Sequence, residues 1–360
     1  MKQTILKNEH FLSAALHLAK NYKHCIILNT GAVDASGPIG DDVAILAAFA
    51  NNTLPSYDFH SLQIPKNEWI FGYLSYDLKN EFEQLSSNNK AFTHFPVYHF
   101  FKPQLLIRIS LKGEFQVLNG NSKEFKNALE QNSNLKNEFE EQVDLEFLSE
   151  TTRLHYLSTV RQIKEEIRNG NVYELNYCLN FSNNHKLDPY KTYHNICHNI
   201  PTPFSCMVKT GKDFALSASM ERFIKKHKST VYSQPIKGTT KRHGNNDKIE
   251  KEALQSDEKE RAENLMIVDL VRNDLNKRAI PGSVNVDELF GVYSYPGVHQ
   301  MISTVSGKFD EDVDFKQLIK DLFPMGSMTG APKISAMQLI EKHEDFRRNL
   351  YSGSVGYIKP

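Results

Sequence analysis

The stretch FSCMVKTGKDFALSASMERFIKKHKSTVYSQPIKGTTK, residues 204–241, decides the fold class. Short runs of apolar and β-branched residues predict strands at 204–210, 214–219 and 230–234. These strands follow one another without the crossover helix that parallel strands need. The stretch therefore favours an α+β fold with antiparallel sheets over a doubly wound one.

The flanking segments continue this mixture. Helices are predicted at 152–170, 257–279 and 331–346 from the spacing of their apolar residues. Gly170 is placed to end the first helix, Asp257 to cap the second, and Pro332 to lie near the first position of the third. Further strands are expected at 25–30, 69–78, 97–101, 104–110, 171–181, 283–293 and 300–309.

One markedly polar segment, 119–150, is the best candidate for a boundary, as a short helix followed by a solvated connection. It separates a sheet-forming region at 1–118 from a region at 151–360 that holds the chemical motifs. We expect the two regions to form one interleaved structural unit.

The composition excludes some classes of function. Lys+Arg and Asp+Glu both number 43 in the 360 residues, which gives no reason to expect nucleic acid or a membrane as a partner. Four scattered cysteines without CxxC spacing are typical of a reduced compartment. Residues 1–20 resemble an amphipathic helix, and no run approaches the ~20 apolar residues of a membrane span. We therefore predict a cytoplasmic protein.

Two residues near the quoted strands have catalytic potential. Lys237 lies between a proline that restricts the backbone and a glycine that frees it. A nucleophilic lysine must be neutral, which requires burial or a nearby cation to lower its pKa. Glu221 follows a strand-like run, where a buried carboxyl with a raised pKa suits a general acid. Taken alone, a solvated Lys237 and a salt-bridged Glu221 are the more common arrangements.

A possible metal site lies on the 257–279 helix. Glu260 and Glu263 share one face there, and two carboxylates can hold a hard cation such as Mg²⁺. Basic neighbours make a solvated, charged first turn the alternative. Further along, three charged residues in an apolar run predict buried ion pairs that support architecture; they are Asp269, Arg272 and Asp274.

The loop FPMGSMTGAPK, 323–333, contains two glycines and runs into a predicted helix. Its backbone N–H groups, with the hydroxyls of Ser327 and Thr329, are candidates for an anion cradle suited to a carboxylate. An ordinary turn at the start of a helix is the alternative. The glycine spacing is not that of a phosphate-binding Walker loop.

In this order, the motifs resemble those of the chorismate-utilising enzymes, and within that family the aminodeoxychorismate synthase component I branch. The stretches that carry the resemblance are GYLSYDLKNEFE (72–83), GNVYELN (170–176), MERF (220–223), PIKGT (235–239), ERAENLMIVDLVRNDL (260–275), PGVHQMISTV (296–305), GSMTGAPK (326–333) and GSVGY (353–357). The resemblance implies two large antiparallel sheets packed together, with helices outside and the active site between them. It makes 151–360 the chorismate-binding region.

The branch depends on Lys237 and Glu174. Anthranilate synthases, which the chain also resembles, carry Ala at the first position, and isochorismate synthases carry Lys at the second. The resemblance implies that Lys237 attacks C2 of chorismate while Glu221 protonates the departing C4 hydroxyl. Ammonia then displaces Lys237 and gives 4-amino-4-deoxychorismate, a transaminase-type reaction that leads to p-aminobenzoate and folate.

The resemblance also implies ligands and a partner. Mg²⁺ on Glu263, backed by Glu260, is expected to bind the ring carboxylate of chorismate. Four residues match positions that contact chorismate in the family, namely Gly238, Thr239, Thr329 and Tyr357. Ammonia is expected from a separate glutamine amidotransferase subunit, because nothing in the chain resembles a Cys-His glutaminase.

The sequence departs from the family pattern in places. Met220 replaces the usual proline before Glu221, and Gln300 stands where anthranilate synthases have His, so we assign no acid–base role to His299. The chain ends at Pro360, before the family segments that carry a carboxylate-binding Arg, a glycine-rich turn and a second acidic Mg²⁺ ligand. We therefore expect weak Mg²⁺ binding and little turnover. The alternatives are anthranilate formation and a catalytically inactive subunit that binds an amidotransferase.

Overall fold

The computed structural model describes residues 2–30, 43–131, 145–243 and 247–360, so most of the predicted polar connection beyond residue 131 lies outside the described residues. Its helices are α1 (Lys2–Ala19), α2 (Lys79–Phe82), α3 (Ser122–Gln131), α4 (Arg153–Arg168), α5 (Pro189–Asn199), α6 (Asp247–Ser256), α7 (Glu258–Asn276), α8 (Phe315–Leu322) and α9 (Lys333–His343), with short 3₁₀ turns at Tyr76–Leu78 and Gly326–Met328. The strands of the first half are β1 (His24–Asn29), β2 (Ile45–Ala50), β3 (Ile70–Leu74), β4 (Tyr98–Phe101), β5 (Leu105–Ile109) and β6 (Phe115–Asn119). Those of the second half are β7 (Glu174–Leu175), β8 (Phe204–Thr210), β9 (Asp213–Ser219), β10 (Arg222–His227), β11 (Thr230–Gln234), β12 (Ile236–Lys241), β13 (Asn285–Tyr295), β14 (Val298–Lys308), β15 (Gly330–Ala331) and β16 (Ser354–Ile358).

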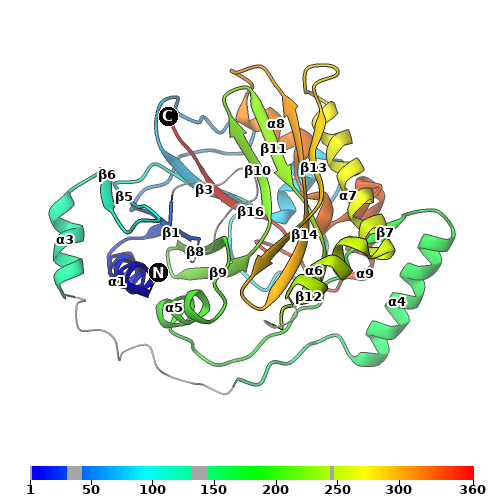
Figure 1. Ribbon diagram of the computed structural model, residues 1–360, viewed down its shortest axis with the longest axis horizontal. Helices are drawn as coiled ribbons and strands as arrows, with labels where there is room; N and C mark the ends of the chain where they lie inside the picture. Colours follow the sequence, from blue (N-terminus) through cyan, green and yellow to red (C-terminus); the bar gives the residue numbers. More distant parts are fainter. Residues whose placement is uncertain (1, 31–42, 132–144, 244–246) are drawn as a thin grey trace.

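The strands form two large sheets and two small ones (Figure 1). One large sheet has the order β6-β5-β2-β1-β8-β9, and the other has the order β10-β11-β14-β12 with β13 also paired to β14. The small sheets are β16-β3-β4 and β15-β7. The strand pairs of these sheets are all antiparallel, which confirms the predicted α+β class. Strands from both sides of the polar segment share the first sheet, where β1 pairs with β8.

The six-stranded sheet is covered on both faces, and strand β2 shows how its sequence fits this position. Alternate side chains of a strand point to opposite faces. Ile45, Ala47 and Phe49 join a core cluster with helices α1, α3 and α5. Leu46, Ala48 and Ala50 join a second cluster with β3 and β4 of the three-stranded sheet. Burial on both faces explains why this strand is an unbroken apolar run.

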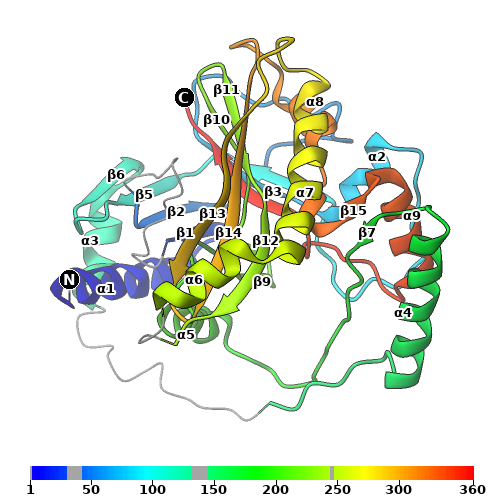
Figure 2. The same ribbon diagram turned by 45° about the vertical axis from the view of Figure 1, so that its right-hand side comes forward.

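Helix α7 lies along the β12–β14 region of the five-stranded sheet (Figure 2). It begins after Asp257, whose side chain accepts a hydrogen bond from Glu260 N at 2.9 Å, so the predicted N-cap is confirmed. One stripe of the helix packs against β11, β14 and α8, and its buried members are Ile267, Val268, Val271 and Leu275. The predicted end of α4 is also confirmed, since Gly170 follows the helix at a positive φ of 77°.

Several sequence predictions were wrong in detail. The stretch 204–241 forms five strands and not three. The additional strand β10 lies between the second and third predicted strands, and β12 follows the third. The strand expected at 171–181 is reduced to the two residues of β7, which pair only with the short β15. By contrast, the predicted place of Pro332 near the first position of α9 is confirmed, since it is the N-cap residue directly before Lys333.

The charged residues in the middle of α7 do not all behave as predicted. Asp274 is buried and pairs with Lys277 at 2.8 Å and with Lys333. Asp269 pairs with Arg272 at 3.0 Å, but its side chain is 75% exposed, so the prediction of burial was wrong for this pair. The reason is that α7 buries a single stripe, and Asp269 projects from the opposite face. In the described part of the chain, no helix combines the length and the apolar content needed to cross a membrane.

Candidate active site

Lys237 lies at an irregularity in strand β12. The register of β12 on β14 shifts between Ile236 and Thr239, and Gly238 has a φ of +93° that favours glycine. Bulges of this kind redirect side chains and occur often beside active sites. The carbonyl of Lys237 accepts a hydrogen bond from Asn264 Nδ2 at 3.4 Å, so α7 supports the irregular backbone.

The Lys237 ammonium pairs with the carboxylate of Glu174 on β7. The two side chains are only 15% and 16% exposed, so this lysine is not the solvated residue that its local sequence alone favours. Glu174 Oε1 accepts the hydrogen bond, whereas Oε2 is buried without a hydrogen-bond partner among the described residues. A buried carboxylate oxygen left in this state is a candidate proton acceptor or ligand contact.

Glu221 lies between β9 and β10, next to the same strand. Its Oε1 accepts a hydrogen bond from Ile236 N at 3.0 Å. Burial raises the pKa of the Glu221 carboxyl above its usual value, while the nearby Ser327 hydroxyl, the Ile236 N–H and the positive charge of Lys237 oppose that shift. A carboxyl whose pKa is raised by burial stays protonated at higher pH and is suited to donate a proton.

Gly238 connects Lys237 to the predicted metal ligands. A Cβ added at Gly238 would lie 3.2 Å from Cβ and Oε2 of Glu260 and 3.3 Å from Cβ of Met301. The backbone of β12 therefore packs directly against the first turn of α7. This close approach places Glu260 beside Gly238, the residue that follows the predicted nucleophile in the chain.

Glu260 and Glu263 share the ammonium of Lys259, at 3.1 and 2.8 Å. The hydrogen bonds and charges of Glu263 and then Glu260 raise the pKa of Lys259. One cation is thus already held between the two carboxylates, and their oxygen donors match the preference of Mg²⁺. The residues fit the predicted ion, provided that Lys259 moves aside when Mg²⁺ binds.

Several donors of the 323–333 loop, where we expected an anion cradle, bind carbonyls of the same loop, whereas the Ser327 hydroxyl lies near Glu221. Thr329 is fully buried, and its hydroxyl donates to the carbonyls of Met325 and Gly326 at 3.2 and 3.1 Å. The N–H groups of Met328 and Thr329 also donate to carbonyls of the same loop. These donors are used internally because the loop closes on itself as a 3₁₀ turn and β15 before α9 begins.

The remaining predicted substrate contacts lie in different surroundings. Thr239 follows Gly238 on β12, is exposed and stands opposite Gln300 on β14. Tyr357 lies on β16 of the three-stranded sheet, where its ring centroid is 5.6 Å from those of Trp69 and Phe71. The structure thus clusters Lys237, Glu221, Gly238 and Glu260, and it places Tyr357 in an aromatic group on another sheet.

Two supporting residues were not singled out from the sequence. Asn264 is buried, bonds to the carbonyl of Lys237 and accepts from Ser303 Oγ at 2.6 Å. Arg348 is buried and paired with Glu344 at 2.6 Å, and it donates to the carbonyls of Met328 and Asn176 at 2.7 Å. Asn264 was recognisable as an amide in an otherwise apolar helix stripe. Arg348 had no comparable signal, because the two carbonyls that it binds come from other segments of the chain.

Comparison with known proteins shows the family. Residues 36–360 match the family described as chorismate binding enzyme. Aminodeoxychorismate synthase component 1 of Klebsiella aerogenes is 38% identical over 209 residues, which are 58% of this chain and 46% of that protein. Anthranilate synthase component 1 of Aquifex aeolicus is 31% identical over 323 residues, which are 83% of this chain and 65% of that protein. The chain thus spans about half the length of the first of these relatives.

A solved structure supports the fold. Anthranilate synthase component I from Streptococcus pneumoniae TIGR4 superposes with a TM-score of 0.69 at 24% identity, and the match covers 82% of this chain and 71% of that one. The packed antiparallel sheets therefore have an experimental counterpart.

Proposed function

The chain belongs to the chorismate binding enzyme family, and on that premise we propose that it aminates chorismate at C4 to give 4-amino-4-deoxychorismate. The observation that carries this proposal is the pairing of Lys237 with Glu174 beside the partly buried acid Glu221, whose pKa is raised. Three relatives near 38% identity that are named aminodeoxychorismate synthase component 1 support the same branch.

The first half of the reaction forms a covalent adduct. Lys237 loses a proton to Glu174, the carboxylate already in contact with it, and its neutral amine forms a bond to C2 of chorismate. The ring double bonds shift and the C4–O bond breaks. Glu221 gives its proton to the departing hydroxyl, which leaves as water.

The second half reverses the shift. Ammonia forms a bond to C4, the ring double bonds move back, and the bond between C2 and Lys237 breaks. Lys237 is then regenerated as a neutral amine. Because the lysine occupies C2 during this step, nitrogen enters at C4.

Glu263 and Glu260 would hold Mg²⁺, which when bound supplies neutralising charge for the ring carboxylate. Gly238 serves this arrangement by allowing the backbone beside Lys237 to approach Glu260 closely. We propose a glutamine amidotransferase as the source of ammonia, in keeping with the "component 1" names of the relatives. The product would then serve p-aminobenzoate and folate synthesis.

Chorismate, Mg²⁺ and ammonium are supplied to the protein, and the products are identified by liquid chromatography and mass spectrometry. The proposal predicts 4-amino-4-deoxychorismate, together with a chorismate-derived adduct on Lys237. Lys241, which is exposed on the same strand, provides the control variant Lys241→Ala. If Lys237→Ala and Lys241→Ala gave the same product at the same rate, the lysine mechanism would be wrong.

Anthranilate formation is the second candidate, because the match to an anthranilate synthase extends over 83% of this chain. The two products separate the candidates directly. Anthranilate is aromatic and fluorescent and has lost the enolpyruvyl group, whereas 4-amino-4-deoxychorismate keeps both the cyclohexadiene ring and that group.

A further inference from the structure

A second group of potential metal ligands lies between α6 and the five-stranded sheet. Asp247 and Glu250 occupy the first turn of α6, and His299 lies on β14. One ligand atom from each of the three side chains lies within 4.8 Å of the others. The group is separate from the Glu260 and Glu263 pair on α7.

His299 is the feature that distinguishes this group from an ordinary acidic cluster. Its side chain is 0% exposed, and Nε2 has no hydrogen-bond partner among the described residues. Nε2 faces Asp247 Oδ1 at 3.7 Å and Glu250 Oε2 at 3.8 Å. An enclosed ring nitrogen aimed between two carboxylates is what a metal ligand looks like without its ion.

The other ring nitrogen of His299 is already held. Nδ1 lies 2.9 Å from Ser294 Oγ, which can accept its proton. In that tautomer the lone pair of Nε2 lies toward the two carboxylates, and either a proton or a metal cation between them offsets the repulsion. Metal-bound histidines commonly have their second ring nitrogen anchored by such a hydrogen bond.

Of the two carboxylate oxygens that face His299, Asp247 Oδ1 has no hydrogen-bond partner among the described residues, whereas Glu250 Oε2 already accepts a hydrogen bond from His243 N. Arg242 Nε donates to Asp247 Oδ2 at 2.7 Å, and Asp247 Oδ1 is buried without a hydrogen-bond partner among the described residues. His243 contacts Glu250 through its ring at 2.5 Å and through its backbone N–H at 3.1 Å. These contacts with His243 lower the pKa of Glu250.

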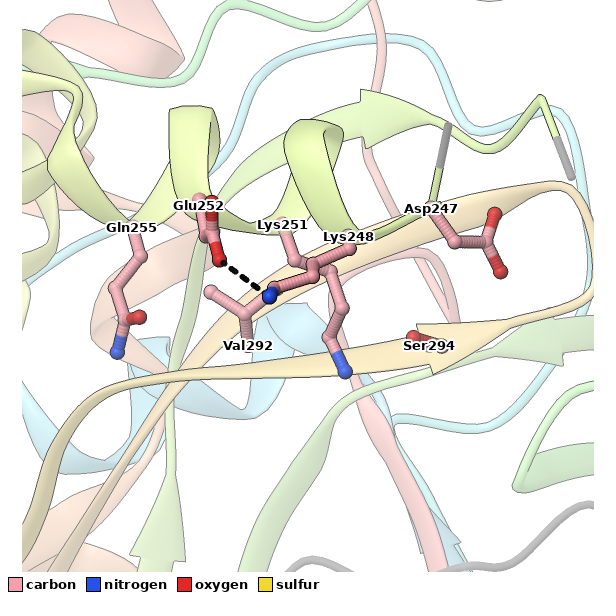
Figure 3. Close-up of a pocket in the computed structure, with 7 residues that line it drawn as sticks. All are labelled: Asp247, Lys248, Lys251, Glu252, Gln255, Val292 and Ser294. Atoms are coloured by element: carbon pink, nitrogen blue, oxygen red, sulfur yellow. Dashed lines mark ion pairs between the residues drawn. The ribbon is translucent and has the colours of Figure 1, made fainter. Parts of the chain in front are cut away.

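An open pocket provides a route to the cluster. It has a volume of about 520 Å³, and its lining includes Asp247 and Ser294. Asp247 faces Nε2 of His299, and Ser294 lies beside Nδ1 of the same ring. Figure 3 shows Asp247 and Ser294 at one end of the pocket and Gln255 at the other, with the Lys248–Glu252 ion pair between them. An ion can therefore reach Asp247 from solvent.

We propose that Asp247, Glu250 and His299 bind a divalent transition ion of the Zn²⁺ class, with water in the remaining position. One imidazole and two carboxylates suit Zn²⁺, whereas Mg²⁺ prefers oxygen donors alone. The ion would join the start of α6 to β14. Because His299 stands opposite Thr240 on β12, it would also steady the end of the strand that carries Lys237. The proposal does not depend on which reaction the protein performs.

Zn²⁺ binding by the chelator-treated full chain tests the proposal, with the affinity measured by competition against a chromophoric chelator and the melting temperature recorded in parallel. We expect one Zn²⁺ per chain and a rise in melting temperature that equal Mg²⁺ does not give. The double variant Asp247→Asn/Glu250→Gln leaves the buried histidine in place. Its Zn²⁺ affinity should fall by more than the roughly 10–100-fold that is lost when a residue hydrogen-bonded to a metal ligand is removed. Glu252→Gln, on the same helix and outside the cluster, should bind as the wild type does.

Two results would overturn the proposal. One is a wild-type chain that takes up no Zn²⁺ at millimolar concentration. The other is a double variant that binds Zn²⁺ as tightly as Glu252→Gln, since binding would then come from other histidines of the chain.

Discussion

Lys237 and Lys333 are both enclosed lysines paired with a carboxylate, but their surroundings differ. Lys333 pairs with Asp274, and the two side chains are 10% and 6% exposed. Its ammonium also donates to the carbonyl of Leu322 at 3.0 Å, and Lys277 binds the other oxygen of Asp274 at 2.8 Å. Every oxygen of this carboxylate has a partner, as expected of a pair that supports architecture.

The Lys237 region leaves groups unused. Glu174 has one buried oxygen without a hydrogen-bond partner among the described residues, and Glu221 has a pKa raised by burial. Both features cost stability, and features of this kind are typical of functional sites. The comparison teaches that burial of a lysine is not informative by itself. What separates the two sites is whether the neighbouring acids are already satisfied.

The largest expected effect comes from removing Lys237, the proposed nucleophile. Lys237→Ala should lower the amination rate by on the order of 10⁴-fold, because it removes the covalent route. Measured rates of chorismate consumption with ammonium check this. If the variant retained more than a tenth of the wild-type rate, Lys237 would not differ from Lys333 in having a chemical role.

Lys333→Ala should act on stability instead. It leaves the buried Asp274 without its enclosed partner, which costs about 3–5 kcal/mol. Urea unfolding measures the loss, with Lys342→Ala on the exposed side of α9 as the control. A Lys333 variant that unfolds like this control, yet fails to form the chorismate adduct, would show that Lys333 has a chemical role.

Glu221→Gln should reduce the rate by roughly 10²–10³-fold, because it removes the proposed general acid.

The raised pKa of Glu221 also predicts a pH effect on stability. The folded state holds this proton more tightly than the unfolded state does, so the contribution is complete below the unfolded pKa of about 4.3 and is lost as pH rises through the raised pKa.

Unfolding free energies of the wild type and Glu221→Gln, measured across that pH range, show whether stability rises or falls with pH. The wild type should lose stability relative to the variant as pH increases. A difference that stays constant with pH would mean that Glu221 is not perturbed.

The smallest expected effect is at Gly238. Gly238→Ala forces a side chain into a positive φ and toward Glu260 at 3.2 Å, which should cost about 1–3 kcal/mol. Gly297→Ala is the matched control, since Gly297 also has a positive φ but open space around it. If both variants lost the same stability and both kept their Mg²⁺ affinity, the close contact between Gly238 and Glu260 would contribute neither to stability nor to Mg²⁺ binding.

The sequence predicted the antiparallel class, most strands and the caps of α4 and α7, because these depend on local spacing. It also pointed to Lys237 and Glu221. Two features were not predictable, namely the Glu174 oxygen without a partner and the hydrogen bonds from Arg348 to the carbonyls of Met328 and Asn176. Both arise from segments that are far apart in the chain. The exposed Asp269 was misread because an apolar run does not show which stripe of a helix faces the core.

The most direct test of the central claim is peptide mass spectrometry of the protein after incubation with chorismate and Mg²⁺ in the absence of ammonia. The account predicts a chorismate-derived adduct on Lys237, absent from Lys333 and discharged when ammonium is added. An adduct that forms equally in Lys237→Ala, or product formation with no adduct on Lys237 at any time, would contradict it.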